Sequence, residues 1–176
     1  MSKVGLKRWR WAGESGATIA LGAALIVGAA ALAQGADPAP DRSQDMAWVS
    51  AQQAALAERA ATAGWQSTEG GLLWRRVGGD GSGAHPTVDD VVTVHYTGSF
   101  VDGGVFDSSE GGEPATFPLG NLIPAWKLAI PQMAVGDTIE LAAPAPLAYG
   151  MKGKGPIPGG ATLLFTVRLI AIGERP

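Results

Sequence analysis

Short strand-like runs separated by glycine and proline dominate the chain after residue 70, and this spacing restricts the fold more than any other feature. The runs are rich in β-branched and aromatic residues, which are typical of strands. Pro124 fits the first turn of one short helix, and Pro131 stops that helix. The pattern predicts an α+β domain in which antiparallel strands surround one stubby helix. The expected strands cover residues 71–77, 91–96, 138–142 and 162–172, with a hairpin at 100–106.

Alternation within these strands predicts which side chains face the core, because successive residues of a strand point to opposite faces. Val92, Val94 and Tyr96 share one face. His95 points to the other face, where a structural or surface role is expected rather than a catalytic one. In the last strand, the inward set is Leu163, Phe165, Val167, Leu169 and Ala171.

The N-terminus predicts export. Basic residues between positions 3 and 10 precede an uncharged run over 17–33, which ends in Ala31-Leu32-Ala33. This is the plan of a secretory signal peptide, with a mature chain starting near Gln34. An uncleaved membrane anchor is the alternative. Residues 1–33 are therefore a signal peptide or membrane anchor, and the remainder is expected in the periplasm or cell envelope, or anchored to the inner membrane and facing the periplasm.

Two segments separate this N-terminus from the strand-rich domain, which we expect over 65–176. Residues 34–42 read as a flexible linker, and residues 43–64 as a helical extension capped by Asp45 and ended by Gly64. This helix either lies on the domain, acts as a spacer arm, or forms a homodimer through 43–63. Its apolar stripe is weak, because alanine buries little surface. The stripe consists of Ala47, Ala51, Ala54, Ala55 and Leu56.

Composition excludes several classes of function. The chain has no cysteine, which rules out disulfides, thiolate nucleophiles and cysteine-bound zinc. Residues 1–33 carry a net charge of +3, whereas the remainder carries −6 and has no basic stripe, so we expect no nucleic-acid partner. Two histidines without cysteine make a poor metal site, and the glycines at 79–83 are not followed by the lysine of a phosphate-binding loop. We expect neither a metal nor a cofactor.

Aromatic residues are the remaining candidates for a site. Each of them, taken singly, is most simply a core residue, because aromatic side chains at strand spacing are usually buried. Taken together, they gather near glycine turns in the strand-rich half of the chain. The set is Tyr96, Phe100, Phe106, Phe117, Trp126, Tyr149 and Phe165.

The order of these residues resembles the FKBP family of peptidyl-prolyl cis/trans isomerases, of the exported bacterial type, along nearly the whole of residues 66–173. Each matching string is weak alone, whereas all of them in the family's order are specific. The strings are Val94-His95-Tyr96-Thr97-Gly98, Asp102-Gly103, Val105-Phe106-Asp107-Ser108-Ser109, Phe117-Pro118-Leu119-Gly120, Leu122-Ile123-Pro124-Ala125-Trp126, Met133-Ala134-Val135-Gly136, Leu147-Ala148-Tyr149-Gly150 and Ile157-Pro158 before Ala161-Thr162-Leu163-Leu164-Phe165.

The resemblance implies a five- to six-stranded sheet wrapped around one short helix, with an aromatic pocket for a substrate proline between them. Trp126 would be the floor, Tyr149 would offer its hydroxyl to a substrate carbonyl, and Asp107 would be the acid at the rim. Ile157 would lie in a flap, residues 151–159. The implied catalytic residues are Tyr96, Phe106, Asp107 and Tyr149, and the implied substrate-binding residues are Phe117, Leu122, Ile123, Trp126, Ile157 and Phe165.

The activity implied by the resemblance is cis/trans isomerisation of X-Pro bonds in unfolded or partly folded polypeptides, without a cofactor. Macrolide inhibitors are implied as further ligands. Ala115 and Leu147 depart from the family, which often has aromatic residues at those positions, so substrate preference and macrolide affinity are expected to differ. The alternative function is a non-catalytic binding module or holdase chaperone that uses the same pocket.

Overall fold

A computed structural model describes residues 39–40, 42 and 44–173 of the chain. The predicted signal peptide or anchor, and most of the predicted linker, lie outside these residues. Among the residues that are described, no helix is both long enough and apolar enough to cross a membrane.

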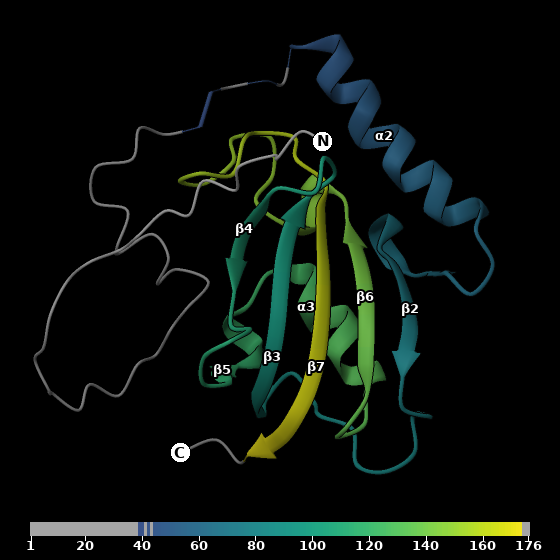
Figure 1. The fold of residues 1–176 in the computed structure, drawn as a ribbon, viewed down its shortest axis with the longest axis vertical. Coiled ribbons are helices and arrows are strands. Elements are labelled where there is room, and N and C mark those ends of the chain that lie inside the picture. The colour runs from purple at the N-terminus through teal and green to yellow at the C-terminus, as the bar shows by residue number, and fades with distance from the viewer. Residues whose placement is uncertain (1–38, 41, 43, 174–176) are drawn as a thin grey trace, which may run out of the picture.

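One antiparallel sheet forms the body of the protein (Figure 1). The prediction of an α+β fold with a sheet around a short helix is confirmed. The sheet has seven strands rather than five or six, because two short strands, β1 and β5, escaped the sequence pattern. The order is β1 (Gln66–Ser67), β2 (Leu73–Gly78), β6 (Thr138–Ala143), β7 (Leu163–Gly173), β3 (Val91–Phe100) and β4 (Val105–Ser108), with β5 (Ala115–Pro118) also paired to β3.

Strand β3 pairs with two different partners along its outer edge. Its first half, residues 91–94, pairs with β5, and residues 97–99 pair with β4. The turn into β4 is tight. Gly103 adopts a φ of 89°, which glycine tolerates without a steric penalty, and the Gly104 amide donates to the Asp102 carboxylate at 2.9 Å. The predicted hairpin is thus confirmed, and it brings β4 back beside β3.

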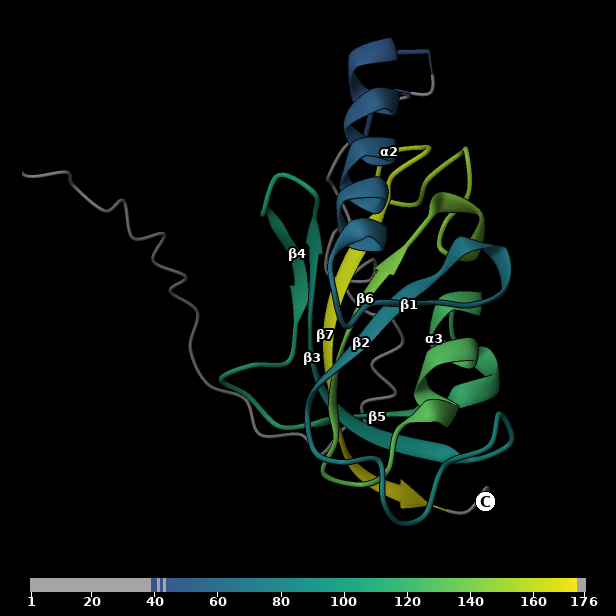
Figure 2. The ribbon, with the colours of Figure 1, turned by 90° about the vertical axis from the view of Figure 1, so that its right-hand side faces the viewer.

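Helix α3 (Pro124–Ala129) packs against one face of the sheet (Figure 2). Pro124 stands at its start, where the missing amide hydrogen costs nothing. Pro131 cannot donate to the helical ladder, so the chain tightens into a 3₁₀ turn over Ile130–Gln132. Ala125, Trp126 and Ala129 are fully buried against the sheet. The small alanines let the helix approach closely while the indole fills the space between the two layers.

The inward alternation of the strands is confirmed except at one position. Val92, Val94 and Tyr96 are buried along β3, and the inward set of β7 is buried from Leu163 to Leu169. Ala171 is exposed instead, so the prediction for this residue was wrong. The register with β3 shifts beyond Val94, which inserts one extra residue into β7 and turns the following side chains over.

Helix α2 (Met46–Ala61) lies on the domain, with the Asp45 side chain accepting from the Trp48 amide as a cap. Its buried residues are Trp48 and Gln52. The predicted alanine stripe was wrong, since Ala47, Ala51 and Ala54 are exposed. The helix docks through one aromatic and one amide side chain four residues apart, a pattern that counting apolar residues does not detect.

A buried carboxylate holds the turn before β6. Asp137 is 2% exposed, and its oxygens accept from the amides of Ala134 at 2.9 Å and Gly81 at 3.2 Å and from the Arg76 guanidinium at 3.1 Å. Burial alone would raise the pKa of Asp137, but these donors outweigh it and lower the pKa below its ordinary value. One ionised side chain thus ties the glycine-rich loop after β2 to the body of the domain.

Candidate active site

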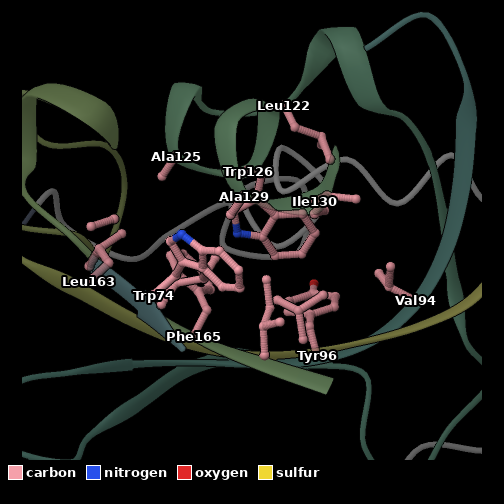
Figure 3. Packing of buried hydrophobic residues seen from close by; sticks show 14 of the residues in the cluster. Trp74, Val94, Tyr96, Leu122, Ala125, Trp126, Ala129, Ile130, Leu163 and Phe165 are labelled. Carbon is pink, nitrogen blue, oxygen red and sulfur yellow. The ribbon is translucent and has the colours of Figure 1, made fainter. Parts of the chain in front are cut away.

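Four aromatic rings from four different elements meet between α3 and the sheet. The indole of Trp126 lies 5.3 Å from the ring of Tyr96, 5.6 Å from Phe165 and 6.1 Å from Phe117, centroid to centroid, and all three contacts are edge to face. Figure 3 shows Trp126 reaching from α3 toward Tyr96 and Phe165 on the sheet. Aromatic pairs favour this geometry, so the rings hold one another in place.

Phe106 of β4 completes the group, with its ring 5.8 Å from that of Phe165. We call Tyr96, Phe106, Phe117, Trp126 and Phe165 the ring cluster. The structure therefore brings together the five aromatic residues that the sequence assigned to the floor and walls of a pocket.

Gly98 is a determinant of the ring cluster that sequence reasoning missed. It stands opposite both Asp107 and Phe165 in the sheet. A Cβ at this position would lie 2.6 Å from Cζ of Phe106, closer than a Cβ atom can approach, and 3.1 Å from Cε1 of Phe165, which is a tight contact. Glycine thus makes room for both rings. The sequence analysis ended the strand at residue 96 and gave Gly98 only as the last residue of a string that resembles the family, whereas β3 runs through it; a glycine inside a strand often marks close packing by a neighbour.

A short hydrogen bond joins two of the predicted catalytic residues. The Tyr96 hydroxyl donates to Oδ2 of Asp107 at 2.6 Å, from adjacent strands. Burial, and then this bond to a carboxylate, raise the pKa of the Tyr96 hydroxyl above its ordinary value, so it stays protonated. Asp107 is half-buried and therefore stands at the border between the ring cluster and solvent.

Tyr149 follows the 3₁₀ turn Ala145–Leu147 and packs against the core. Its hydroxyl is buried and has no hydrogen-bond partner within the described residues. Burial, and then the charge of Asp107, raise the pKa of Tyr149 to about 12. A buried polar group is nearly always paired in a folded protein. This hydroxyl is therefore a neutral donor whose acceptor is not found among the described residues.

The indole of Trp126 is fully covered, although the sequence predicted a floor open to ligand. Its Nε1 is also without a partner among the described side chains and backbone. Leu122 and Ile157 are both 6% exposed and belong to the same hydrophobic core, and Ile123 packs against it half-buried. Leu122, Ile123 and Ile157 thus belong to, or pack against, the core that contains the indole. A ligand would reach the indole only after neighbouring side chains move.

The open side of the site lies beside Tyr96 and Asp107. A cavity of about 550 Å³ is lined there by Tyr96 and by residues 107–116, which form the end of β4, the connecting loop and the start of β5. Its volume falls within the range of small-ligand sites. Ala115 is part of this lining, at a position where the family often has an aromatic residue. Alanine fills less of the cavity there than an aromatic side chain would.

Comparisons with known proteins agree with this geometry. The family of FKBP-type peptidyl-prolyl cis-trans isomerases matches residues 83–170. The FKBP-type peptidyl-prolyl cis-trans isomerase FkpA of Aeromonas hydrophila is 48% identical over 122 residues, which are 69% of this chain and 45% of the relative. An FKBP-type 22 kDa peptidyl-prolyl cis-trans isomerase of Escherichia coli is 49% identical over 119 residues, 66% of this chain and 57% of the relative. The chain thus spans about half the length of these curated relatives.

Two solved structures share the fold. A peptidyl-prolyl cis-trans isomerase of Pseudomonas syringae superposes with a TM-score of 0.68 at 30% identity, covering 78% of this chain and 99% of that one. FkpA of Escherichia coli superposes with a TM-score of 0.72 at 33% identity, covering 76% of this chain and 63% of that one.

A further relative is named outer membrane protein MIP, from Legionella longbeachae. It is 48% identical over 94 residues, which are 52% of this chain and 40% of the relative. The chain belongs to the family of FKBP-type peptidyl-prolyl cis-trans isomerases.

Proposed function

We propose that this protein accelerates the cis/trans isomerisation of X-Pro peptide bonds in unfolded or partly folded polypeptides. One observation carries the proposal most directly: the buried, unpartnered hydroxyl of Tyr149 beside the hydrogen-bonded pair of Tyr96 and Asp107. A substrate carbonyl is an acceptor that would satisfy this donor. The ring cluster supplies the apolar surface on which a proline ring would rest.

Rotation about an X-Pro bond needs no nucleophile and no metal. The barrier of about 18–20 kcal/mol comes from amide resonance, which keeps the bond planar and polarised. A twisted amide has lost that resonance and part of its charge separation. A water-poor aromatic surface therefore favours the twisted form over the planar one, and binding that is stronger in the transition state raises the rate. Each tenfold in rate corresponds to about 1.4 kcal/mol of such differential binding.

The individual residues then take distinct roles. Trp126 supports the proline ring, and Phe106, Phe117 and Phe165 enclose it. Tyr149 donates to the carbonyl of the residue before proline. Tyr96 fixes Asp107 at the rim of the site.

The backbone of the segment before α3 provides the remaining contacts with the bound chain. In this proposal, Leu122 and Ile123 meet the substrate backbone, and Ile157 closes the ring cluster from the flap.

A proline-peptide isomerisation assay on the full chain tests the proposal. We expect catalysis in the wild type, and weaker catalysis after Tyr149→Phe, Asp107→Val or Trp126→Ala. Val135→Ala, in the exposed turn before β6, is the control and should retain the wild-type rate. Wild-type rates equal to those in buffer would remove the enzymatic function. Suppressed aggregation of an unfolded client without any catalysis would favour the holdase alternative, which the names of the relatives do not favour.

Export to the cell envelope is part of the proposal. It rests on the basic and then apolar pattern of residues 1–33 and on the name of one relative, an outer membrane protein. Sequencing the N-terminus of the protein purified from its native host separates the two alternatives for this segment. A first residue near Gln34 indicates a cleaved signal, and Met1 indicates an anchor.

Two further partners complete the proposal. Macrolide inhibitors would bind the ring cluster, with an affinity altered by Ala115 and Leu147, and a fluorescence titration measures it. A homodimer through 43–63 would use the exposed face of α2, because Trp48 and Gln52 are buried against the domain. Light scattering at high micromolar concentration decides this question, and a monomer there excludes the dimer.

A further inference from the structure

We propose that Trp48 and Gln52 of α2 are positioning residues that hold the flap, residues 151–159, in the place where it closes the ring cluster. The proposal rests on the proposed isomerase function, for which the flap would form part of the substrate site. It assigns to the helical extension a role in the active site of its own domain.

The flap is a tightly folded loop with one apolar anchor. Lys154 and Ile157 exchange two backbone hydrogen bonds, at 2.9 and 3.0 Å, and the Gly160 amide closes the base of the loop onto the Gly150 carbonyl at 3.0 Å. Ile157 is 6% exposed and belongs to the same core as Trp126. The flap therefore contributes one side chain to the core that also contains Trp126.

Helix α2 contacts the chain where the flap returns to the sheet. Oε1 of Gln52 accepts from the Thr162 amide at 2.8 Å, in a buried position. The Trp48 indole donates to the Gly159 carbonyl in a long hydrogen bond of 3.4 Å, and its Nε1 lies over Gly160. Both figures show α2 at the same end of the sheet as the loop before β7 (Figures 1 and 2).

These contacts involve both buried residues of α2, Trp48 and Gln52, and Val49 packs against the core beside them. The docking of α2 therefore depends in part on the region around the flap. The segment before α2 adds a second tie, because the Ala39 amide donates to the Gly155 carbonyl at 2.9 Å. Arg42 stacks over the Trp48 ring at 4.3 Å and pairs with the capping carboxylate of Asp45, which fixes the start of the helix. The extension thus contacts the flap at Gly155 and Gly159 and the residue Thr162 that follows it.

Gln52→Met is the informative variant, because it keeps the length of the side chain and removes only its amide. Nε2 of Gln52 is already buried without a partner, so the variant removes one unpaired donor and creates another at the Thr162 amide. Global stability should therefore change little, whereas the tie to the flap is lost. Gln53→Met is the matched control, since Gln53 is the exposed neighbour on the same helix.

The test combines amide hydrogen exchange with isomerase kinetics on the full chain. We expect Gln52→Met to speed exchange at the amides of Ile157, Gly160 and Thr162 by about tenfold, and to raise KM by up to about tenfold with little change in kcat, because binding must then order the flap. Trp48→Phe, which keeps an aromatic ring and removes the indole donor, should shift both readouts in the same direction.

Three results would overturn the proposal: flap exchange unchanged in both variants, faster exchange with wild-type KM, or equal effects from Gln53→Met. A wild-type protein without isomerase activity would refute the proposed function instead. In that case hydrogen exchange still decides whether α2 holds the flap.

Discussion

Replacing Tyr149 by phenylalanine should change stability and activity in opposite directions. In the free protein, the hydroxyl is buried without a partner, and a buried unsatisfied polar group costs about 1–3 kcal/mol. Removing it should therefore raise the free energy of unfolding by about 1 kcal/mol, or the Tm by about 2–4 °C for a chain of this size. The same change removes the donor to the substrate carbonyl, so kcat/KM should fall about tenfold, since one hydrogen bond is worth roughly 1.4 kcal/mol.

Tyr96→Phe provides the contrast that makes this prediction sharp. The Tyr96 hydroxyl donates to Asp107, so its removal leaves a half-buried carboxylate without that donor and should lower stability by about 1–3 kcal/mol. Denaturant unfolding of the two variants measures both signs, and a proline-peptide assay measures the rates. If Tyr149→Phe lowers stability as Tyr96→Phe does, the Tyr149 hydroxyl has a partner in solution and the reasoning is refuted.

Alkaline unfolding gives an independent check on Tyr149. Its pKa is raised from an ordinary 10.0 to about 12, because burial and the Asp107 charge disfavour the ionised form. The native state therefore holds its proton longer than the unfolded state, and the associated stability is complete below pH about 10 and lost as the pH rises toward 12. The Tyr149→Phe variant should lose less of its free energy of unfolding between pH about 10 and 12 than the wild type does. Ionisation of Tyr96 affects the wild type and the variant equally. Parallel curves for wild type and variant above pH 10 would contradict the assignment.

Two further predictions concern residues outside the proposed contacts with substrate. Gly98→Ala should lower the free energy of unfolding by about 1–3 kcal/mol and lower the rate of catalysis, because the new methyl group displaces the rings of Phe106 and Phe165. Unchanged unfolding and kinetics would show that the rings can move without cost. Asp137→Asn should cost about 2 kcal/mol at neutral pH, measured by denaturant unfolding. Since the pKa of Asp137 is lowered, this stabilisation begins to be lost as the pH falls below about 4, and the gap between wild type and variant should narrow. A gap that does not narrow as the pH falls would contradict the role of the charge.

The fold was largely readable from the sequence where local chemistry decides the structure. Alternation identified the inward face of β3, because Val92, Val94 and Tyr96 can be buried together only in one register. Pro131 limited α3 because proline has no amide hydrogen to donate. Ala171 was misassigned, because a bulge depends on pairing with a distant strand and leaves no mark in the sequence of β7 itself.

The site was readable only in part, for a related reason. The matching strings named the members of the ring cluster, and the structure gathers them around Trp126. The sequence did not reveal that the indole is fully covered, since its exposure depends on how side chains from several distant elements pack around it. Gln52 was missed because it is buried in order to accept a hydrogen bond from the Thr162 amide, 110 residues away. A polar side chain on a helix is ordinarily expected to be exposed.

The place of β7 has a consequence for how a newly made chain matures. This strand follows every other described strand in the sequence, yet it lies between β6 and β3 and makes ladders with both. Before β7 has paired, its two neighbours have open edges, and Trp126 lacks the ring of Phe165 beside it. The pairing of β7 with β3 joins residues far apart along the chain, which slows folding. The sheet is therefore completed only when the last described strand is inserted between two strands that precede it in the sequence.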